Sequence, residues 1–275
     1  MPKLFNLLPC VLCLLLLACQ KPYVLERHHR AVGTSERIGF IVLHYTAEDD
    51  ANSLEILTTK QVSSHYLIPT GNTKTIYQLV ADDKAAWHAG ASSFGGRTRF
   101  NDIAIGIEIV NEGIAKEYLN HKGYHPYTHF VAYQDVQIAK LGALLQTLSK
   151  QYNIPPKHIL AHSDIAPSRK IDVGAKFPWQ RLYQDYGIGA WYDEVDRQYF
   201  LQVVDFDKLS ISEIKAELRA YGYTINDGDH WDKASTDVVY AFQLHFNPMY
   251  ATGVMDKNSF AILKALNKKY PNTPQ

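Results

Sequence analysis

The sequence predicts an α/β fold with a central mixed β-sheet flanked by helices, followed by a small C-terminal domain of three helices. Two patterns predict this class. Before Tyr192, short continuous apolar runs, which are typical of buried strands, are mixed with segments whose apolar residues recur at helical spacing. After Tyr192, only the helical spacing continues. Mixed strands and helices pack in layers around a sheet, whereas consecutive helices form a bundle of their own.

The elements of the first domain follow from local patterns. Gly39-Phe40-Ile41-Val42-Leu43 is a short apolar run, as is the segment from Ala104 to Ile109. Gly71-Asn72 is a turn signal between two strand-like segments and predicts a looped strand pair. The expected elements, in chain order, are a strand at 39–43, a short helix at 53–60, paired strands at 64–68 and 75–79, a strand at 104–109, an amphipathic helix at 134–152 and a strand at 158–161.

The C-terminal segment carries helix signals of its own. Ser210-Ile211-Ser212-Glu213 is a capping box, and Gly222 ends the helix that it opens. The apolar spacing from Val238 to Phe246 and from Phe260 to Tyr270 predicts two more helices. No catalytic constellation is visible among these helices, so they form either a structural cap on the first domain or a binding module.

Charge and cysteine usage restrict the function. Lys plus Arg and Asp plus Glu number 28 each among 275 residues, and this zero formal charge argues against a nucleic-acid partner. The cysteines are Cys10, Cys13 and Cys19, all near the N-terminus, so the folded body has no thiolate for a disulfide or a metal site. A metal site in the body must therefore be built from histidine and carboxylate groups.

The first eighteen residues have the pattern of an export signal. Lys3 precedes a mostly apolar run, Leu4 to Ala18, that is shorter than the about 20 residues a membrane-spanning helix needs. Leu16-Leu17-Ala18-Cys19 resembles the lipobox of bacterial lipoproteins, in which the chain is cut before a cysteine that receives lipid. The alternative is a signal anchor that is not cleaved. The expected organisation is a signal peptide at 1–18, a lipidated tether at 19–36, the α/β domain at 37–192 and the helical domain at 193–275.

Polar residues at the ends of two predicted strands indicate a metal site. His44 follows one buried strand and His162 another, the position where α/β sheets place functional groups. Catalytic zinc commonly takes three His or carboxylate ligands and keeps one position open. The nearby acids are Asp164, Asp172 and Glu108, and Glu108 lies in an apolar strand, where a carboxylate needs a partner. A salt-bridged structural glutamate is the alternative for Glu108.

Other hydrolytic sites are poorly supported. The sequence has no His-Glu-x-x-His helix and no Gly-x-Ser-x-Gly elbow, and its cysteines all lie in the N-terminal signal segment. Metal-assisted hydrolysis is therefore the favoured reaction class.

Five motifs occur in an order that resembles a known family. The chain resembles the zinc-dependent type-2 N-acetylmuramoyl-L-alanine amidases, which share a fold with peptidoglycan recognition proteins. Its C-terminal helices are similar to peptidoglycan-binding domains. The motifs that carry the resemblance are Ile41–Thr46, Val62–Leu67, Ala86–Gly90, Asn101–Glu108 and Ala161–Asp172.

The resemblance implies roles for particular residues. By position, one Zn²⁺ per chain is held by His44, His162 and Asp172, while Glu108 and Lys170 are the catalytic residues. The sequence departs from the family's usual Asp-Pro-Gly at the third ligand, where it has Asp172-Val173-Gly174, but the ligand oxygen is retained. Weaker candidates for substrate binding along the cleft are His65, His88, Arg99 and Asn101.

The implied activity is hydrolysis of the amide between the lactyl group of N-acetylmuramic acid and L-alanine of the stem peptide. The sequence does not decide between intact muramic acid and its 1,6-anhydro form. The implied partners are peptidoglycan, its muropeptides and a membrane reached through lipidated Cys19, without nucleic acid. The expected protein is a monomer on the outer membrane that faces the periplasm. The alternatives are a non-catalytic peptidoglycan-binding lipoprotein and a purely structural tether to the cell wall.

Overall fold

The computed structural model describes residues 25–29, 31–34 and 36–271. The predicted signal peptide and Cys19 lie outside these residues. By its contacts the chain divides into a unit of residues 1–35 and a unit of residues 36–275, and the second unit holds the sheet and helices. Among the described residues, no helix has the length and apolar character that crossing a membrane requires.

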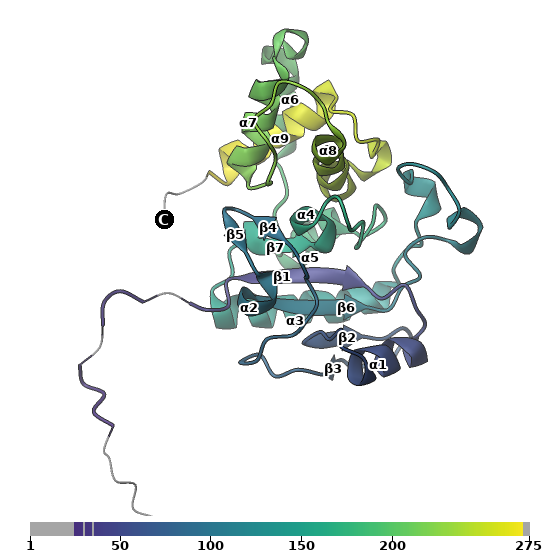
Figure 1. Cartoon of the computed structure of the whole chain (residues 1–275), viewed down its shortest axis with the longest axis vertical. Coiled ribbons are helices and arrows are strands. Elements are labelled where there is room, and N and C mark those ends of the chain that lie inside the picture. Colours follow the sequence, from purple (N-terminus) through teal and green to yellow (C-terminus); the bar gives the residue numbers. More distant parts are fainter. Residues whose placement is uncertain (1–24, 30, 35, 272–275) are drawn as a thin grey trace, which may run out of the picture. The chain divides into compact units, whose positions relative to one another are not determined.

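The central sheet has the strand order β3-β2-β6-β1-β7 (Figure 1). Strands β2, β6, β1 and β7 are parallel, and β3 is antiparallel to β2, so the sheet is mixed, as predicted. Ile41, Val42 and Leu43 in the middle of β1 are completely buried, as expected for a parallel strand that is covered on both faces. The strands are β1 (Phe40–Tyr45), β2 (Tyr66–Ile68), β3 (Tyr77–Gln78), β6 (Ala104–Ile109) and β7 (Ile159–Ala161).

Helices flank this sheet and continue into the C-terminal region (Figure 1). In the first part of the unit they are α1 (Asp50–Thr59), α2 (Phe100–Ile103), α3 (Asp135–Tyr152), α4 (His162–Ile165) and α5 (Trp179–Tyr186). In the C-terminal region they are α6 (Glu194–Val203), α7 (Ile211–Tyr221), α8 (Lys233–Phe246) and α9 (Lys257–Lys269). Short 3₁₀ turns lie at 116–118, 127–129, 156–158, 206–208 and 248–250.

The predicted start and end signals of α7 are confirmed. Ser210 Oγ accepts the backbone N–H of Glu213 at 3.2 Å, and the Glu213 carboxylate accepts the N–H of Ser210 at 2.8 Å. This reciprocal pair is the capping box that the sequence predicts. Gly222 follows the helix with a φ of 132°, and a Cβ there would meet the ring of Phe94 at 2.7 Å. Glycine at position 222 therefore permits both the positive φ at the end of the helix and the close approach of the Phe94 ring.

The sequence prediction misses four helices, α2, α4, α5 and α6, and one hairpin. Helix α6 has no buried residue: Val195, Tyr199 and Val203 recur at helical spacing along the sequence, but all three are exposed. The hairpin of β4 (Ser93–Phe94) and β5 (Arg97–Thr98) has strands of two residues each, too short for an alternating pattern to show.

The β4–β5 hairpin joins the sheet part of the unit to the C-terminal helices. Phe94 forms an isolated antiparallel bridge with Tyr223, and their rings meet edge to face at 5.4 Å between centroids. The backbone N–H of Gly95 also donates to the carbonyl of Gly222 at 2.7 Å. Residues of both regions belong to one hydrophobic core, which includes Leu43 and Leu263. The predicted boundary between residues 192 and 193 stays a prediction, because residues 36–275 form one compact unit.

Candidate metal centre

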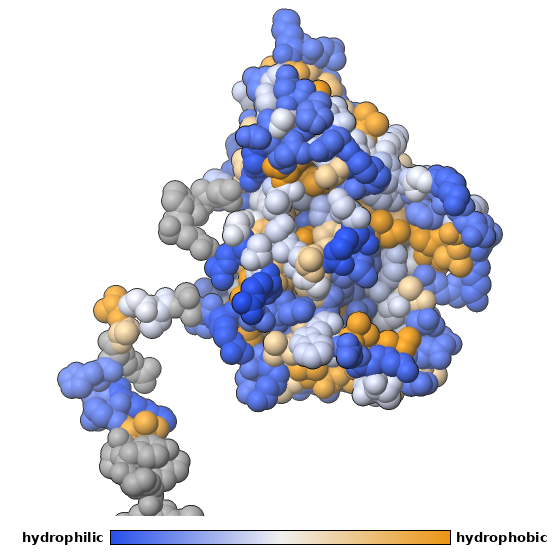
Figure 2. Space-filling model, viewed as in Figure 1, coloured by the Kyte–Doolittle hydropathy of each residue, from blue (hydrophilic) through white to orange (hydrophobic). Residues whose placement is uncertain are grey.

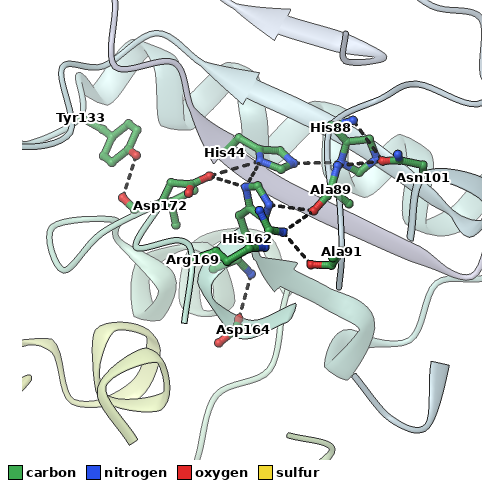
Figure 3. Close-up of polar contacts among 12 residues, drawn as sticks. His44, His88, Ala89, Ala91, Asn101, Tyr133, His162, Asp164, Arg169 and Asp172 are labelled. Carbon is green, nitrogen blue, oxygen red and sulfur yellow. Dashed lines mark hydrogen bonds and ion pairs between the residues drawn. The ribbon is translucent and has the colours of Figure 1, made fainter. Parts of the chain in front are cut away.

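Three side chains converge at the carboxyl ends of β1 and β7. His44 lies near the end of β1, His162 begins α4 directly after β7, and Asp172 lies in the loop after α4. The Nδ1 atoms of the two histidines are 2.9 Å apart, and Oδ2 of Asp172 lies 3.2 Å from Nδ1 of His44 and 3.0 Å from Nδ1 of His162 (Figure 3). All three residues are buried. The structure thus brings the predicted ligand set together.

This cluster fits a tetrahedral metal ion. Zinc bonds of about 2.0–2.1 Å place ligand atoms about 3.3 Å apart, close to the separations observed here. Among the described residues, His44, His162 and Asp172 are the group of metal-binding side chains whose ligand atoms all lie within 4.8 Å of one another. Val173 stands where the family usually has proline, and Asp172 still points at both histidines.

The electrostatics favour the protonation states that bind metal. Burial, followed by the neighbouring His162, lowers the pKa of His44 to about 4, against the opposing effect of Asp172. Burial alone would raise the pKa of Asp172, but His162 and His44 lower it well below its ordinary value. A neutral imidazole beside an ionised carboxylate at neutral pH is the state in which these groups coordinate a cation.

Hydrogen bonds behind the ligands fix the orientation of both imidazole rings. Nε2 of His162 donates to the carbonyl of Ala89 at 3.1 Å, which leaves its Nδ1 lone pair for a metal. Nε2 of His44 lies 2.9 Å from Nδ1 of His88. A metal bound through Nδ1 of His44 requires the proton on Nε2, which then donates to His88 (Figure 3).

The segment that carries these acceptors is itself held in place. Oδ1 of Asn101 accepts the N–H groups of His88 and Ala89 at 3.1 and 2.8 Å. The guanidinium of Arg169 donates to the carbonyls of Ala89 at 2.9 Å and Ala91 at 2.6 Å. Arg169 was not predicted as a site residue, since nothing in its neighbourhood along the sequence indicates a partner about eighty residues earlier.

A glycine in β6 makes room for the ring of His88. A Cβ at Gly106 would meet Cγ of this histidine at 2.5 Å, closer than side chains approach one another. An isolated glycine in an apolar strand is the sequence signal for such a close approach.

The weaker sequence candidates are found in different places. His88 lines the pocket at the metal centre, whereas His65, Arg99 and Asn101 are not among the lining residues. His65 is completely buried: its Nδ1 accepts the N–H of Gly106 at 3.0 Å and its Nε2 donates to a backbone carbonyl at 3.1 Å. Arg99 is exposed and pairs with Asp102 at 2.7 Å. These positions favour a structural role for His65 and Asn101. The assignment of the four residues to substrate binding stays a prediction.

Glu108 lies beside the metal centre on the neighbouring strand. Its side chain is half-buried, and Oε2 is shielded from solvent without a hydrogen-bond partner in the described structure. Burial raises the pKa of Glu108 to about 8, the negative charge of Asp172 raises it too, and Lys170 opposes the shift. Because Oε2 of Glu108 has no partner among the described residues, the structure argues against a salt-bridged structural glutamate, the alternative that the sequence allows.

A pocket of about 400 Å³ opens above these groups. The ligand cluster, Glu108 and Lys170 all line it, together with the largely exposed ring of Trp87. On the face shown in Figure 2, hydrophobic residues form small groups among hydrophilic ones. The pocket thus combines a candidate metal site, an unpaired carboxylate and a lysine, which are the groups that metal-assisted hydrolysis needs.

Comparison with known proteins identifies the family. The model of the family described as N-acetylmuramoyl-L-alanine amidase matches residues 34–175, and a model described as putative peptidoglycan binding domain matches residues 208–263. The chain belongs to the N-acetylmuramoyl-L-alanine amidase family. The amidases of this family are zinc-dependent, so the cofactor that the His44–His162–Asp172 cluster fits is Zn²⁺.

Relatives match over nearly the whole chain. N-acetylmuramoyl-L-alanine amidase AmiD of Escherichia coli strain K12 is 39% identical over 90% of this chain and 89% of its own length. The structure of AmiD from E. coli in complex with the substrate anhydro-N-acetylmuramic acid-L-Ala-D-gamma-Glu-L-Lys matches with a TM-score of 0.81 and 38% identity, covering 91% of this chain and 96% of that one. AmpDh3 from Pseudomonas aeruginosa in complex with anhydromuramic pentapeptide matches with a TM-score of 0.81 and 36% identity, over 92% and 100%.

Proposed function

We propose that this amidase hydrolyses the amide between the lactyl group of N-acetylmuramic acid and L-alanine of the peptidoglycan stem peptide. The observation that carries the proposal is the unpaired, shielded Oε2 of Glu108, one strand away from the ligand His44. A carboxylate without a partner next to a metal centre suits proton transfer, whereas a structural carboxylate is hydrogen-bonded. The pocket above it has room for part of a muropeptide.

The proposed reaction uses the residues that line the pocket. Zn²⁺ held by His44, His162 and Asp172 would supply Lewis-acid polarisation and make water acidic enough to react at neutral pH. Positive charge from Lys170 and from the bound cation would favour the ionised form of Glu108. In that form Glu108 accepts a proton from the attacking water while the C–O bond forms, and returns it to the amine nitrogen as the C–N bond breaks. Lys170 contributes positive charge on the side where the carbonyl oxygen becomes negative. One water is consumed, and a carboxylate and a free amine result.

The 1,6-anhydro form of muramic acid is proposed as an accepted substrate. Two matched structures, AmiD and AmpDh3, are complexes with anhydromuramic peptides, and this chain covers nearly the whole of both. We further propose that the region of residues 208–263 binds peptidoglycan, on the basis of its match to the putative peptidoglycan binding domain.

Digestion of defined muropeptides tests the activity. Purified zinc-loaded protein is incubated with intact and with 1,6-anhydro muropeptides, and the products are identified by mass spectrometry. We expect free stem peptide with an L-alanine amino terminus and muramic acid with a free lactyl carboxylate. Muropeptide that is bound but not cut would instead identify a non-catalytic peptidoglycan-binding protein.

Lipid attachment at Cys19 is proposed from the sequence alone. The lipobox-like segment Leu16-Leu17-Ala18-Cys19 supports an anchored monomer on the outer membrane that faces the periplasm. Two or more acyl chains on one residue suffice for stable anchoring. The test compares the membrane partition and the mass of the mature chain with those of Cys19→Ala. A variant that still pellets with membranes and carries lipid would contradict the proposal.

A further inference from the structure

Asp164 lies two residues after the ligand His162, and three donors surround its carboxylate. Its Oδ2 accepts the backbone N–H of Ala161 at 2.8 Å and Nδ1–H of His245 at 2.7 Å, while its Oδ1 accepts the hydroxyl of Tyr223 at 2.6 Å. Asp164, Tyr223 and His245 are all nearly inaccessible to solvent. Two of the three donors therefore come from the C-terminal helical region, and the third is the backbone immediately before His162.

Both donors from the helical region are rigidly placed. The ring of His245, on α8, stacks on Trp179 of α5 at 3.8 Å between centroids, with 18° between the ring planes. Tyr223 follows α7, and its backbone forms the bridge with Phe94 that joins the two parts of the unit. Aromatic stacking and backbone pairing leave these groups little freedom to follow Asp164 if it moves.

Asp164 is connected to two of the three candidate ligands. By accepting the N–H of Ala161 it fixes the start of α4, whose first residue is His162. The next residue, Ser163, donates its N–H to the backbone carbonyl of Asp172 at 2.8 Å. The third ligand, His44, comes from β1 and does not share this connection. A shift of α4 would therefore move His162 and Asp172 together, relative to His44.

We propose that Asp164, His245 and Tyr223 form a positioning network through which the C-terminal helical region holds His162 and Asp172 at their distance from His44. The inference rests on the proposed metal centre. It gives a structural role in that centre to residues 208–263, the region that matches a peptidoglycan-binding domain. Groups that orient metal ligands typically change metal affinity about 10- to 100-fold when they are removed. The hydrogen bonds of the Asp164 carboxylate go to Ala161, Tyr223 and His245 and not to a ligand side chain, so the effect of the network passes through α4.

The test measures zinc affinity and stability separately in the full chain. The zinc dissociation constant is determined by competition with a chromophoric chelator, and the melting temperature of each metal-free variant is measured in parallel. His245→Ala removes the Nδ1 donor, whereas His245→Asn keeps an N–H donor at a similar place. Tyr223→Phe removes only the hydroxyl. Leu263→Ala, in the buried face of α9, is the matched control that damages the same region without touching Asp164.

We expect His245→Ala to weaken zinc binding about 10- to 100-fold. His245→Asn should recover most of the affinity, and Tyr223→Phe should weaken binding less than His245→Ala does. Leu263→Ala should lower the melting temperature and leave the zinc dissociation constant unchanged. If His245→Ala does not fold, the zinc dissociation constants of Tyr223→Phe and His245→Asn test the proposal without it.

Two results would overturn the network. One is a wild-type zinc dissociation constant in both His245→Ala and Tyr223→Phe. The other is an equal loss of zinc affinity in Leu263→Ala, which would show that general destabilisation accounts for the effect. Failure of the wild-type chain to bind one zinc ion, or undiminished binding by His44→Ala, would instead overturn the metal centre of the proposed function.

Discussion

His44 and Glu108 are direct partners in the parallel register of β1 and β6. A candidate zinc ligand and the proposed proton acceptor therefore project at the same level of two adjacent strands. Parallel pairing fixes this relationship through backbone hydrogen bonds, so it does not depend on a flexible loop. The register also explains why a carboxylate lies within an otherwise apolar strand, since a slip by one residue would turn Glu108 to the opposite face of the sheet.

Replacing Glu108 should remove catalysis without removing the metal. Glu108→Gln keeps the size of the side chain but cannot accept a proton from water. We expect the rate of muropeptide hydrolysis to fall about 10²- to 10⁴-fold, the usual contribution of a positioned acid–base group. The zinc content, measured by atomic absorption, should stay at one ion per chain. Wild-type turnover in a zinc-loaded variant would rule out this role for Glu108.

The same carboxyl group should make the metal-free protein less stable at high pH. The pKa of Glu108 in the fold is raised to about 8 from an ordinary value of 4.5, mainly by burial, so the folded state binds this proton more tightly than the unfolded state does. The contribution to stability is then complete below an ordinary carboxyl pKa of about 4.5 and is lost as the pH rises to about 8.

Glu108→Gln has no such proton to lose, and urea unfolding of chelator-treated protein measures the difference. From about pH 5 to about pH 8, the variant's free energy of unfolding should rise relative to wild type by about 1–3 kcal/mol. This range is smaller than the full pKa shift would give, because solvent reaches and screens the half-buried side chain. A relative stability that does not change with pH would contradict the raised pKa.

Removal of zinc should abolish activity and lower the melting temperature. At a free zinc concentration about 100 times the dissociation constant, binding adds about 2.7 kcal/mol to the free energy of unfolding. His44→Ala removes one of the three ligands and should lose both the activity and the zinc-dependent rise in melting temperature. The measurement is differential scanning fluorimetry with chelator and with added zinc. Activity that survives exhaustive chelation would exclude the metal mechanism.

A side chain at Gly106, in β6, should disturb the metal centre through the ring of His88. In Gly106→Ala the new Cβ would meet Cγ of His88 at 2.5 Å, so the imidazole must leave its present position, in which its Nδ1 lies 2.9 Å from Nε2 of His44. We expect a loss of about 1–3 kcal/mol in the free energy of unfolding, typical of an overpacked core, together with weaker zinc binding. Gly39→Ala is the matched control, because its Cβ would meet no atom within 4 Å. If Gly106→Ala and Gly39→Ala had the same free energy of unfolding and the same zinc affinity, the contact between Gly106 and His88 would not support the metal centre.

The sequence predicts the strands that position the site better than it predicts the site itself. The apolar run at 104–109 is strand β6 to the residue, and His44 and His162 stand out because each ends a buried strand. Only the family resemblance distinguishes Asp172 as the third ligand, because it lies in an irregular loop and Asp164 is closer to His162 along the chain. The structure separates the two acids: Asp172 faces the histidines, whereas Asp164 faces Tyr223 and His245.

The groups that orient the ligands could not be predicted from local patterns. His88 approaches His44 from a segment 44 residues later, and Arg169 reaches back about eighty residues to Ala89. Contacts of this kind depend on how strands and loops pack, and a single sequence records them only as polar residues without a visible partner. Helix α6 is a different case, because Val195, Tyr199 and Val203 recur at helical spacing although none of the residues of the helix is buried.

Lys170 should act on the rate of the reaction more than on substrate binding. It lines the pocket beside Glu108 and supplies the positive charge that opposes the raised pKa of that carboxyl group. If Lys170 stabilises the negative charge that develops on the carbonyl oxygen, Lys170→Met should lower kcat about 10²- to 10³-fold and change KM little. Lys170→Arg keeps the charge and should recover part of the rate.

Lys176→Met is the matched control, because Lys176 lies over the ring of Tyr127 and is not among the residues that line this pocket. A rise in KM at unchanged kcat in Lys170→Met would show that the lysine binds the substrate before the reaction, and its assignment to the transition state would then be wrong.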